Sequence, residues 1–141
     1  MPALGNLTYL VSQASMELGI AQKTIADVVN SKDQDIIQLR SLIQATADEI
    51  LKDEPYKRTL GDGVFIQNAP VGTTPGTKKG AFTANTDIVL IDARLMINGL
   101  KFRFLKAKGL EFGEELRDFA VRMNKIARAV NGKIYDLDDY D

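Results

Sequence analysis

Cysteine and histidine are both missing from the 141 residues of this sequence. Their absence excludes a disulfide-stapled secreted domain, a thiol nucleophile, a Ser-His or Cys-His catalytic pair, a zinc finger and any site with an imidazole ligand. Most common enzyme designs are therefore excluded. We expect a protein that is not an enzyme and that holds no metal and no cofactor.

Long apolar runs are missing as well. No run approaches the roughly 18 residues that a membrane-spanning helix needs, and residues 1–6 lack the basic and apolar regions of a signal peptide. We therefore expect a soluble protein that is made inside the cell and has no membrane partner.

An excess of either charge is also missing, because 18 Lys and Arg residues face 19 Asp and Glu residues, for a formal net charge of -1. Such a balanced chain lacks the global positive field that drives non-specific DNA binding. Its composition, 45% hydrophobic and 26% charged, is that of a globular protein. We predict one helical domain over residues 1–132, with an extended C-terminal arm over residues 133–141.

Apolar residues at helical spacing predict a mainly-α fold, a four-helix bundle. The first helix follows Asn6, which suits an N-cap, and stops at Gly19. The second starts at Ser31, where S-x-x-Q forms a capping box, and Pro55 ends it by residue 54. Its buried stripe is expected to contain Ile36, Leu39, Ile43, Ala47 and Ile50.

The third and fourth predicted helices form a pair. One spans residues 87–108, is capped by Thr86 or Asp87 and stops at Gly109, and its two apolar stripes indicate a central helix packed from several sides. The other spans residues 112–130, after a link so short that the two helices must form an antiparallel hairpin. Its buried seam is expected to contain Leu116, Phe119, Met123, Ile126 and Val130.

Residues 56–85 differ from the rest because glycine, proline and threonine dominate them. This composition predicts no helix but a β-hairpin insertion over residues 60–85, with one strand at 64–67, a partner at 80–83 and a long tip at 69–79. Loops of this length are usually functional or ordered by a partner. We expect an assembly loop with five contact residues: Thr73, Thr74, Lys78, Lys79 and Phe82.

The arm over residues 133–141 alternates acidic and apolar residues and is too short and too charged to fold alone. We expect it to dock outside its own subunit through seven residues: Ile134, Tyr135, Asp136, Leu137, Asp138, Asp139 and Tyr140. A passive terminus is the alternative. A calcium site is disfavoured because the bend glycine and the distal glutamate of an EF-hand loop are missing.

Two further patterns have ordinary structural explanations. The segment 72–80 resembles a phosphate loop, but Thr77 stands where that motif requires glycine, and Pro75 removes a backbone donor. Glu111, Glu114 and Glu115 could pair as acid and base, but the dipole at the start of a helix accounts for them.

Charge is distributed unevenly along the chain. Residues 94–128 contain nine basic and four acidic residues, a net charge of +5, whereas residues 1–62 have a net charge of -3. Three interpretations remain open: an ordinary solvated surface, a weak nucleic-acid-binding face, or head-to-tail packing of identical subunits.

The stretch 99–115, Gly-Leu-Lys-Phe-Arg-Phe-Leu-Lys-Ala-Lys-Gly-Leu-Glu-Phe-Gly-Glu-Glu, resembles the central helix hairpin of head-to-tail adaptor proteins of tailed bacteriophages. In that family a helix with the pattern Gly-Leu, aromatic, Arg, aromatic, Lys-x-Lys-Gly-Leu turns into a last helix that opens with acids. The order of the predicted elements is also similar over nearly the whole chain. Family members often carry Trp after the second helix and in the third, where this chain offers Tyr56, Phe102 and Phe104.

The resemblance implies a structural virion protein of the head-tail connector, made in the host cytoplasm, with an adaptor-type helical fold. Its homo-oligomeric ring, commonly a dodecamer, docks beneath the portal protein and contacts tail or nozzle proteins. DNA passes through the channel of the ring without sequence-specific binding. The alternative function is a small helical nucleic-acid-binding or regulatory module that uses the positive region 94–128.

Overall fold

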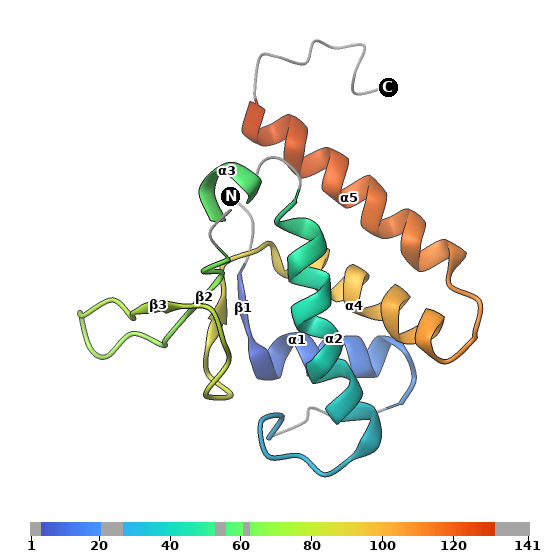
Figure 1. The fold of residues 1–141 in the computed structure, drawn as a ribbon, viewed down its shortest axis with the longest axis horizontal. Coiled ribbons are helices and arrows are strands. Elements are labelled where there is room, and N and C mark those ends of the chain that lie inside the picture. The colour runs from blue at the N-terminus through green and yellow to red at the C-terminus, as the bar shows by residue number, and fades with distance from the viewer. Residues whose placement is uncertain (1–3, 21–26, 53–55, 61–62, 132–141) are drawn as a thin grey trace.

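The computed structural model of the protein describes residues 4–20, 27–52, 56–60 and 63–131 and is mainly α-helical, as predicted (Figure 1). Four helices have eleven or more residues: α1 (Leu7–Glu17), α2 (Gln34–Ile50), α4 (Ala93–Ala107) and α5 (Gly113–Asn131). A fifth, α3 (Tyr56–Leu60), has only five. The predicted arm over residues 133–141 lies outside the described residues.

Side chains just before α1, α2 and α4 set where these three helices begin. Asn6 caps α1, because its Oδ1 accepts from the Tyr9 backbone N–H at 2.8 Å. The prediction that α2 starts at Ser31 was wrong: Asp33 is the N-cap, and its carboxylate accepts from the N–H groups of Asp35 and Ile36. The Ser31 hydroxyl instead accepts from the N–H of Asp33, two residues too early to cap the helix.

The start of α4 was also predicted too early. Neither Thr86 nor Asp87 caps it; Asp92 does, by accepting from the Leu95 N–H at 3.0 Å. Residues 88–89 form a strand instead, and the Asp87 carboxylate accepts from the N–H groups of Thr83 and Ala84 in the preceding turn. The predicted stop at Gly109 is confirmed, because this glycine adopts a φ of +73° after the last turn of α4.

The prediction that residues 56–85 contain no helix was wrong for Tyr56–Leu60. This short segment precedes the glycine-rich stretch and contains neither glycine nor proline. Tyr56 is 9% exposed, and its hydroxyl accepts from the backbone N–H of Asp92 at 3.0 Å. Tertiary contacts of this kind stabilise a single turn that its own propensity would not.

Four two-residue strands form one small antiparallel sheet in the order β1-β4-β2-β3. They are β1 (Gly5–Asn6), β2 (Ile66–Gln67), β3 (Lys78–Lys79) and β4 (Ile88–Val89). A strand was predicted over residues 64–67, and Ile66–Gln67 confirm its second half. It pairs with β3 on one side and with β4 on the other, and not with residues 80–83 as predicted. The chain turns at 83–84 toward Asp87, so that segment is not available for pairing.

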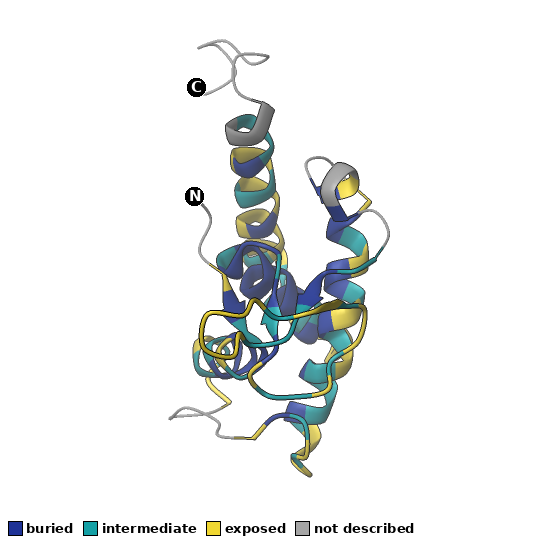
Figure 2. Cartoon of the chain, turned by 90° about the vertical axis from the view of Figure 1, so that its left-hand side faces the viewer, coloured by how far each residue is buried: buried dark blue, intermediate teal, exposed yellow. Residues whose placement is uncertain are grey.

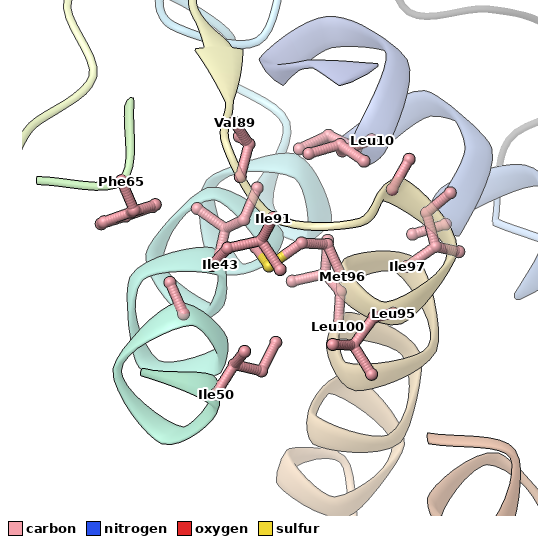
Figure 3. Close-up of a cluster of buried hydrophobic side chains, with 14 of the residues drawn as sticks. Leu10, Ile43, Ile50, Phe65, Val89, Ile91, Leu95, Met96, Ile97 and Leu100 are labelled. Carbon is pink, nitrogen blue, oxygen red and sulfur yellow. The ribbon is translucent and has the colours of Figure 1, made fainter. Parts of the chain in front are cut away.

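The core lies where α1, α2 and α4 meet the sheet, and Leu10, Ile43, Val89, Met96 and Leu100 all point into it (Figure 3). The expected stripe of α2 is buried throughout. Figure 2 shows buried residues concentrated at the centre and exposed ones along one side of α5.

The predicted pairing of the last two helices is confirmed by contacts along α4 and α5. The Phe102 ring of α4 lies 5.3 Å from that of Phe119 and 6.4 Å from that of Phe112. Phe119 and Ile126 are buried as predicted and Met123 is partly buried, but Leu116 is 39% exposed, so its placement in the buried seam was wrong. Leu116 lies in the first turn of α5, on the flank of the buried stripe and not at its centre. The side chain of Val130, the fifth predicted member, lies outside those that the structure describes.

Gly99 of α4 lies in close contact with both α2 and α5. A Cβ atom at this position would lie 2.5 Å from Cγ2 of Thr46 on α2 and 2.9 Å from a ring carbon of Phe119 on α5. Only a residue without a side chain fits such an approach. Gly99 therefore lets α4 contact two helices at the same level.

Candidate functional site: a basic groove and a projecting loop

A shallow groove of about 590 Å³ lies between three helices. It is bounded by the C-terminal end of α1, the first two and a half turns of α4 and the middle of α5. Its walls are mostly polar and charged. Nine residues line it: Glu17, Arg94, Asn98, Lys101, Arg117, Asp118, Val121, Arg122 and Lys125. The groove thus brings together α4 and α5 residues of the positive region that the sequence indicated.

Glu17 neutralises part of the groove. Its Oε1 lies 2.8 Å from Nη1 of Arg94 and 3.0 Å from Nζ of Lys101. Burial alone would raise the pKa of the Glu17 carboxyl, but hydrogen bonds from Arg94, Gln13 and Lys101 outweigh burial and lower the pKa from 4.5 to about 2. The carboxylate therefore stays ionised at neutral pH and joins α1 to α4.

Arg122 forms a bidentate pair with Asp92, whose side chain is 1% exposed. Nε of Arg122 donates to Oδ2 at 2.9 Å and Nη2 donates to Oδ1 at 2.8 Å. This hydrogen bonding raises the pKa of the Arg122 guanidinium, and burial raises the pKa of the neighbouring Tyr56 phenol. Because Asp92 caps α4 and contacts Tyr56, the pair fastens α5 to both α4 and α3.

Two cations of the groove differ from the others. Among the described residues, no ion-pair partner lies within 4.0 Å of Arg117 or Lys125, and both side chains are exposed on α5. Val121, one turn from each, is 54% exposed. The outer wall of the groove therefore combines available positive charge with an apolar side chain.

The positive region divides between two surfaces. Arg103 pairs with Glu49 of α2, and Lys108 lies 3.4 Å from Asp35, so both face α2 and not the groove. The net charge of +5 counted along the sequence consequently does not describe one continuous face.

The glycine-rich loop projects from the sheet on the side opposite to the α4–α5 hairpin (Figure 1). At its tip, Val71 and Thr74 exchange backbone hydrogen bonds of 3.0 and 2.9 Å around Gly72, which has a φ of +60°. Val71 is 79% exposed. The tip is therefore a tight turn that presents an apolar side chain to the solvent.

Gly76 closes the base of this turn. A Cβ atom there would lie 1.7 Å from the carbonyl oxygen of Asn68, so no other residue fits without moving the backbone. The side-chain amide of Gln67 also donates to the Gly76 carbonyl at 2.8 Å. The two limbs of the loop are in this way held together below the tip.

The five predicted contact residues of the loop fall into two groups. Thr73, Thr74 and Lys78 are exposed. Lys79, by contrast, pairs with Asp87 at 2.9 Å, and the Phe82 ring packs edge-on against Phe65 with its centroid 6.1 Å away. Lys79 and Phe82 therefore fix the loop to the domain and leave its tip as the accessible part.

Asn85 ties the base of the loop to two distant segments. Its Oδ1 accepts from the N–H groups of Val28 and Val29, its Nδ2 donates to Asp27 at 2.9 Å, and its carbonyl accepts from both donors of Thr8. No sequence pattern pointed to this residue.

The two disfavoured motifs have structural roles. Segment 72–80 contains strand β3, and no helix follows it as a phosphate loop requires. Oε1 of Glu111 accepts from the Gly113 N–H at 3.1 Å at the start of α5. Across the described ranges, no three acidic side chains gather in a metal-binding arrangement.

In the described part of the chain, no helix combines the length and hydropathy that crossing a bilayer requires. Comparison with models of protein families, with curated proteins and with solved structures gives no match.

Proposed function

We propose that this protein is a head-to-tail adaptor of a tailed bacteriophage, a non-enzymatic subunit of a ring beneath the portal protein. The ring continues the DNA channel and presents a surface to tail components. In this proposal the protein needs no cofactor and belongs to the neck of the virion.

The observation that carries the proposal is the presence of two dissimilar surfaces on separate sides of one small domain. The loop tip exposes Val71, while the groove between α1, α4 and α5 exposes Arg117, Val121 and Lys125. A ring built head to tail requires two different patches on each subunit, since each interface joins one patch to the other. An exposed tip on a fixed base and a charged groove are suited to that use.

The residues that carry the family resemblance also have a structural explanation. Within the stretch 99–115, Leu100, Phe102 and Phe104 are buried, while Lys106 and Lys108 are exposed. Gly99 permits α4 to come close to both α2 and α5. The pattern thus specifies a tightly packed helix hairpin with a basic outer surface, which supports the resemblance at the level of packing.

Native mass spectrometry of the protein, alone and mixed with the portal protein encoded in the same genome, tests the proposal. We expect a ring of identical subunits bound to the portal. Val71→Lys should weaken assembly because it places a positive charge on the tip that meets the basic groove, whereas Leu110→Lys, a matched change at the exposed turn between α4 and α5, should not. If the protein stays monomeric and does not bind the portal protein, the proposal is wrong.

The groove favours a second candidate function, a nucleic-acid-binding module, because five of its nine lining residues are cationic. Gel-shift titration with duplex DNA across a salt series separates the two functions. Phosphate contacts give an affinity that falls steeply with salt. No binding, or binding without that slope, removes the second candidate.

A further inference from the structure

The outer wall of the groove is suited to an acidic, partly apolar peptide more than to a nucleic acid. The groove has five cations, and three of them, Arg94, Lys101 and Arg122, are already paired with carboxylates. A phosphate backbone would therefore find few available positive charges there. Val121, which is 54% exposed between Arg117 and Lys125, offers an apolar contact that a phosphate backbone cannot use.

One segment of this chain has the matching composition. Residues 133–141 contain four aspartates and a single lysine, and these aspartates alternate with Ile134, Tyr135, Leu137 and Tyr140. Acidic and apolar side chains that alternate in this way can meet a surface on which cations flank an apolar residue. Charge complementarity therefore identifies a candidate occupant within the same molecule.

The segment can also reach the groove. Along α5, Lys125 lies about 9 Å and Arg117 about 21 Å before Asn131, at 1.5 Å per residue. An extended chain covers about 17 Å between residue 131 and Asp136, and about 33 Å between residue 131 and Asp141. The dipeptide Asn131-Gly132 is a turn signal that suits a reversal of direction.

The sequence alone led us to expect that residues 133–141 dock outside their own subunit. From the groove we propose instead that, in the free subunit, they fold back along α5 and occupy the basic groove of their own subunit. Aspartates of the segment face Arg117 and Lys125, and an aromatic residue covers Val121. A tethered segment has an effective concentration in the millimolar range, so the contact within one subunit prevails over the same contact between dilute subunits. The groove of the free subunit is consequently covered, and any partner that binds there has to displace the segment. This inference goes beyond the proposed function and does not depend on it.

The absence of native cysteine allows a direct test on the full chain. A spin label is attached to Asp141→Cys, and the loss of amide signal intensity is measured by NMR in dilute protein. We expect the largest loss at residues 117–125. It should disappear at about 1 M salt, where the screening length falls to about 3 Å, and in the double variant Arg117→Glu, Lys125→Glu. Lys78→Glu, a matched charge reversal on the distant strand β3, should leave it unchanged.

A mixed sample distinguishes the segment's own groove from that of a second copy. Isotope-labelled protein without the spin label is combined with spin-labelled protein without isotope, so only contacts between molecules reduce the signal. We expect no loss in this sample. A loss there, or the same weak loss along the whole chain in the first experiment, overturns the proposal. Neither result bears on ring formation, which the mass measurement tests separately.

Discussion

The helices α4 and α5 are neighbours of similar length, yet they are held in different ways. Nine of the 15 residues of α4 are buried, and it contacts α1, α2 and α5. Among the described side chains of α5, only Phe119 and Ile126 are buried, and the bidentate pair of Arg122 supplies a polar attachment. We therefore expect substitutions in α4 to lower the stability of the fold, whereas the outer surface of α5 can change without loss of the fold.

The largest effect is expected in the core face of α4. Leu95→Ala and Phe104→Ala should each lower the free energy of unfolding by about 2–5 kcal/mol, because both side chains are buried and leave a cavity. Urea unfolding followed by circular dichroism measures the change. A loss below about 1 kcal/mol would show that α4 is not the central helix.

Gly99→Ala tests the close approach of α4 to its neighbours. The added methyl group overlaps Thr46 and Phe119, and we expect a loss of about 1–3 kcal/mol in the free energy of unfolding. Thr46→Ser removes one of the overlapping atoms, so the double variant should regain part of the stability. If Gly99→Ala is as stable as the native chain, the two helices can move apart freely.

Arg122→Met tests the polar attachment of α5. It keeps most of the aliphatic contact but leaves the Asp92 carboxylate without its charged partner, so we expect a loss of about 1–3 kcal/mol by urea unfolding. Arg117→Met is the matched control on the same helix and should change stability by less than about 0.5 kcal/mol. Equal losses in the two variants would show that the bidentate pair has no special role.

Acid should weaken the attachment of α1 to α4 through Glu17. Its folded pKa, about 2, lies below its ordinary value of 4.5, so its stabilising effect is complete above about pH 4.5 and is lost as the pH falls from 4.5 toward 2. Glu17→Gln removes this dependence, and its stability should therefore fall less than that of the native protein between about pH 5 and about pH 3. Thr73→Ala, a change at an exposed residue that does not ionise, should follow the native pH profile.

The smallest effect is expected at Val121, on the outer wall of the groove. Val121→Ser should change the free energy of unfolding by less than about 0.5 kcal/mol, because the side chain is 54% exposed. The thermal midpoint measures this. A clear destabilisation would mean that α5 contributes to the core on more than one face.

The helices could be predicted from the sequence wherever their apolar period is long. The stripe of α2, the caps of α1 and the stop at Gly109 follow from local spacing and from single residues. The start of α4 could not be predicted in the same way, because Asp87 and Asp92 are both good caps. The choice between them depends on the turn at residues 83–84, a tertiary feature.

The full sheet and the groove could not be predicted from the sequence, because both depend on contacts between residues that are distant along the chain. Strands of two residues carry no period, so β1 and β4 gave no signal in the sequence. The charge count indicated a positive region, but the pairing of Arg103 with Glu49 divides that region between two faces. Asn85, which joins three segments, has no local signature at all.

The attachments of Asn85 also determine how the loop responds to force. A pull on the exposed turn at Val71 is passed down two closely joined limbs to the segment around Asn85 and Asp87. From there the hydrogen bonds to Thr8 and Leu7 carry the load into the first turn of α1. We therefore expect the loop to act as a stiff extension of the domain, so that tension at its tip reaches the first turn of α1 and, through Asn85, the segment at Val28 and Val29.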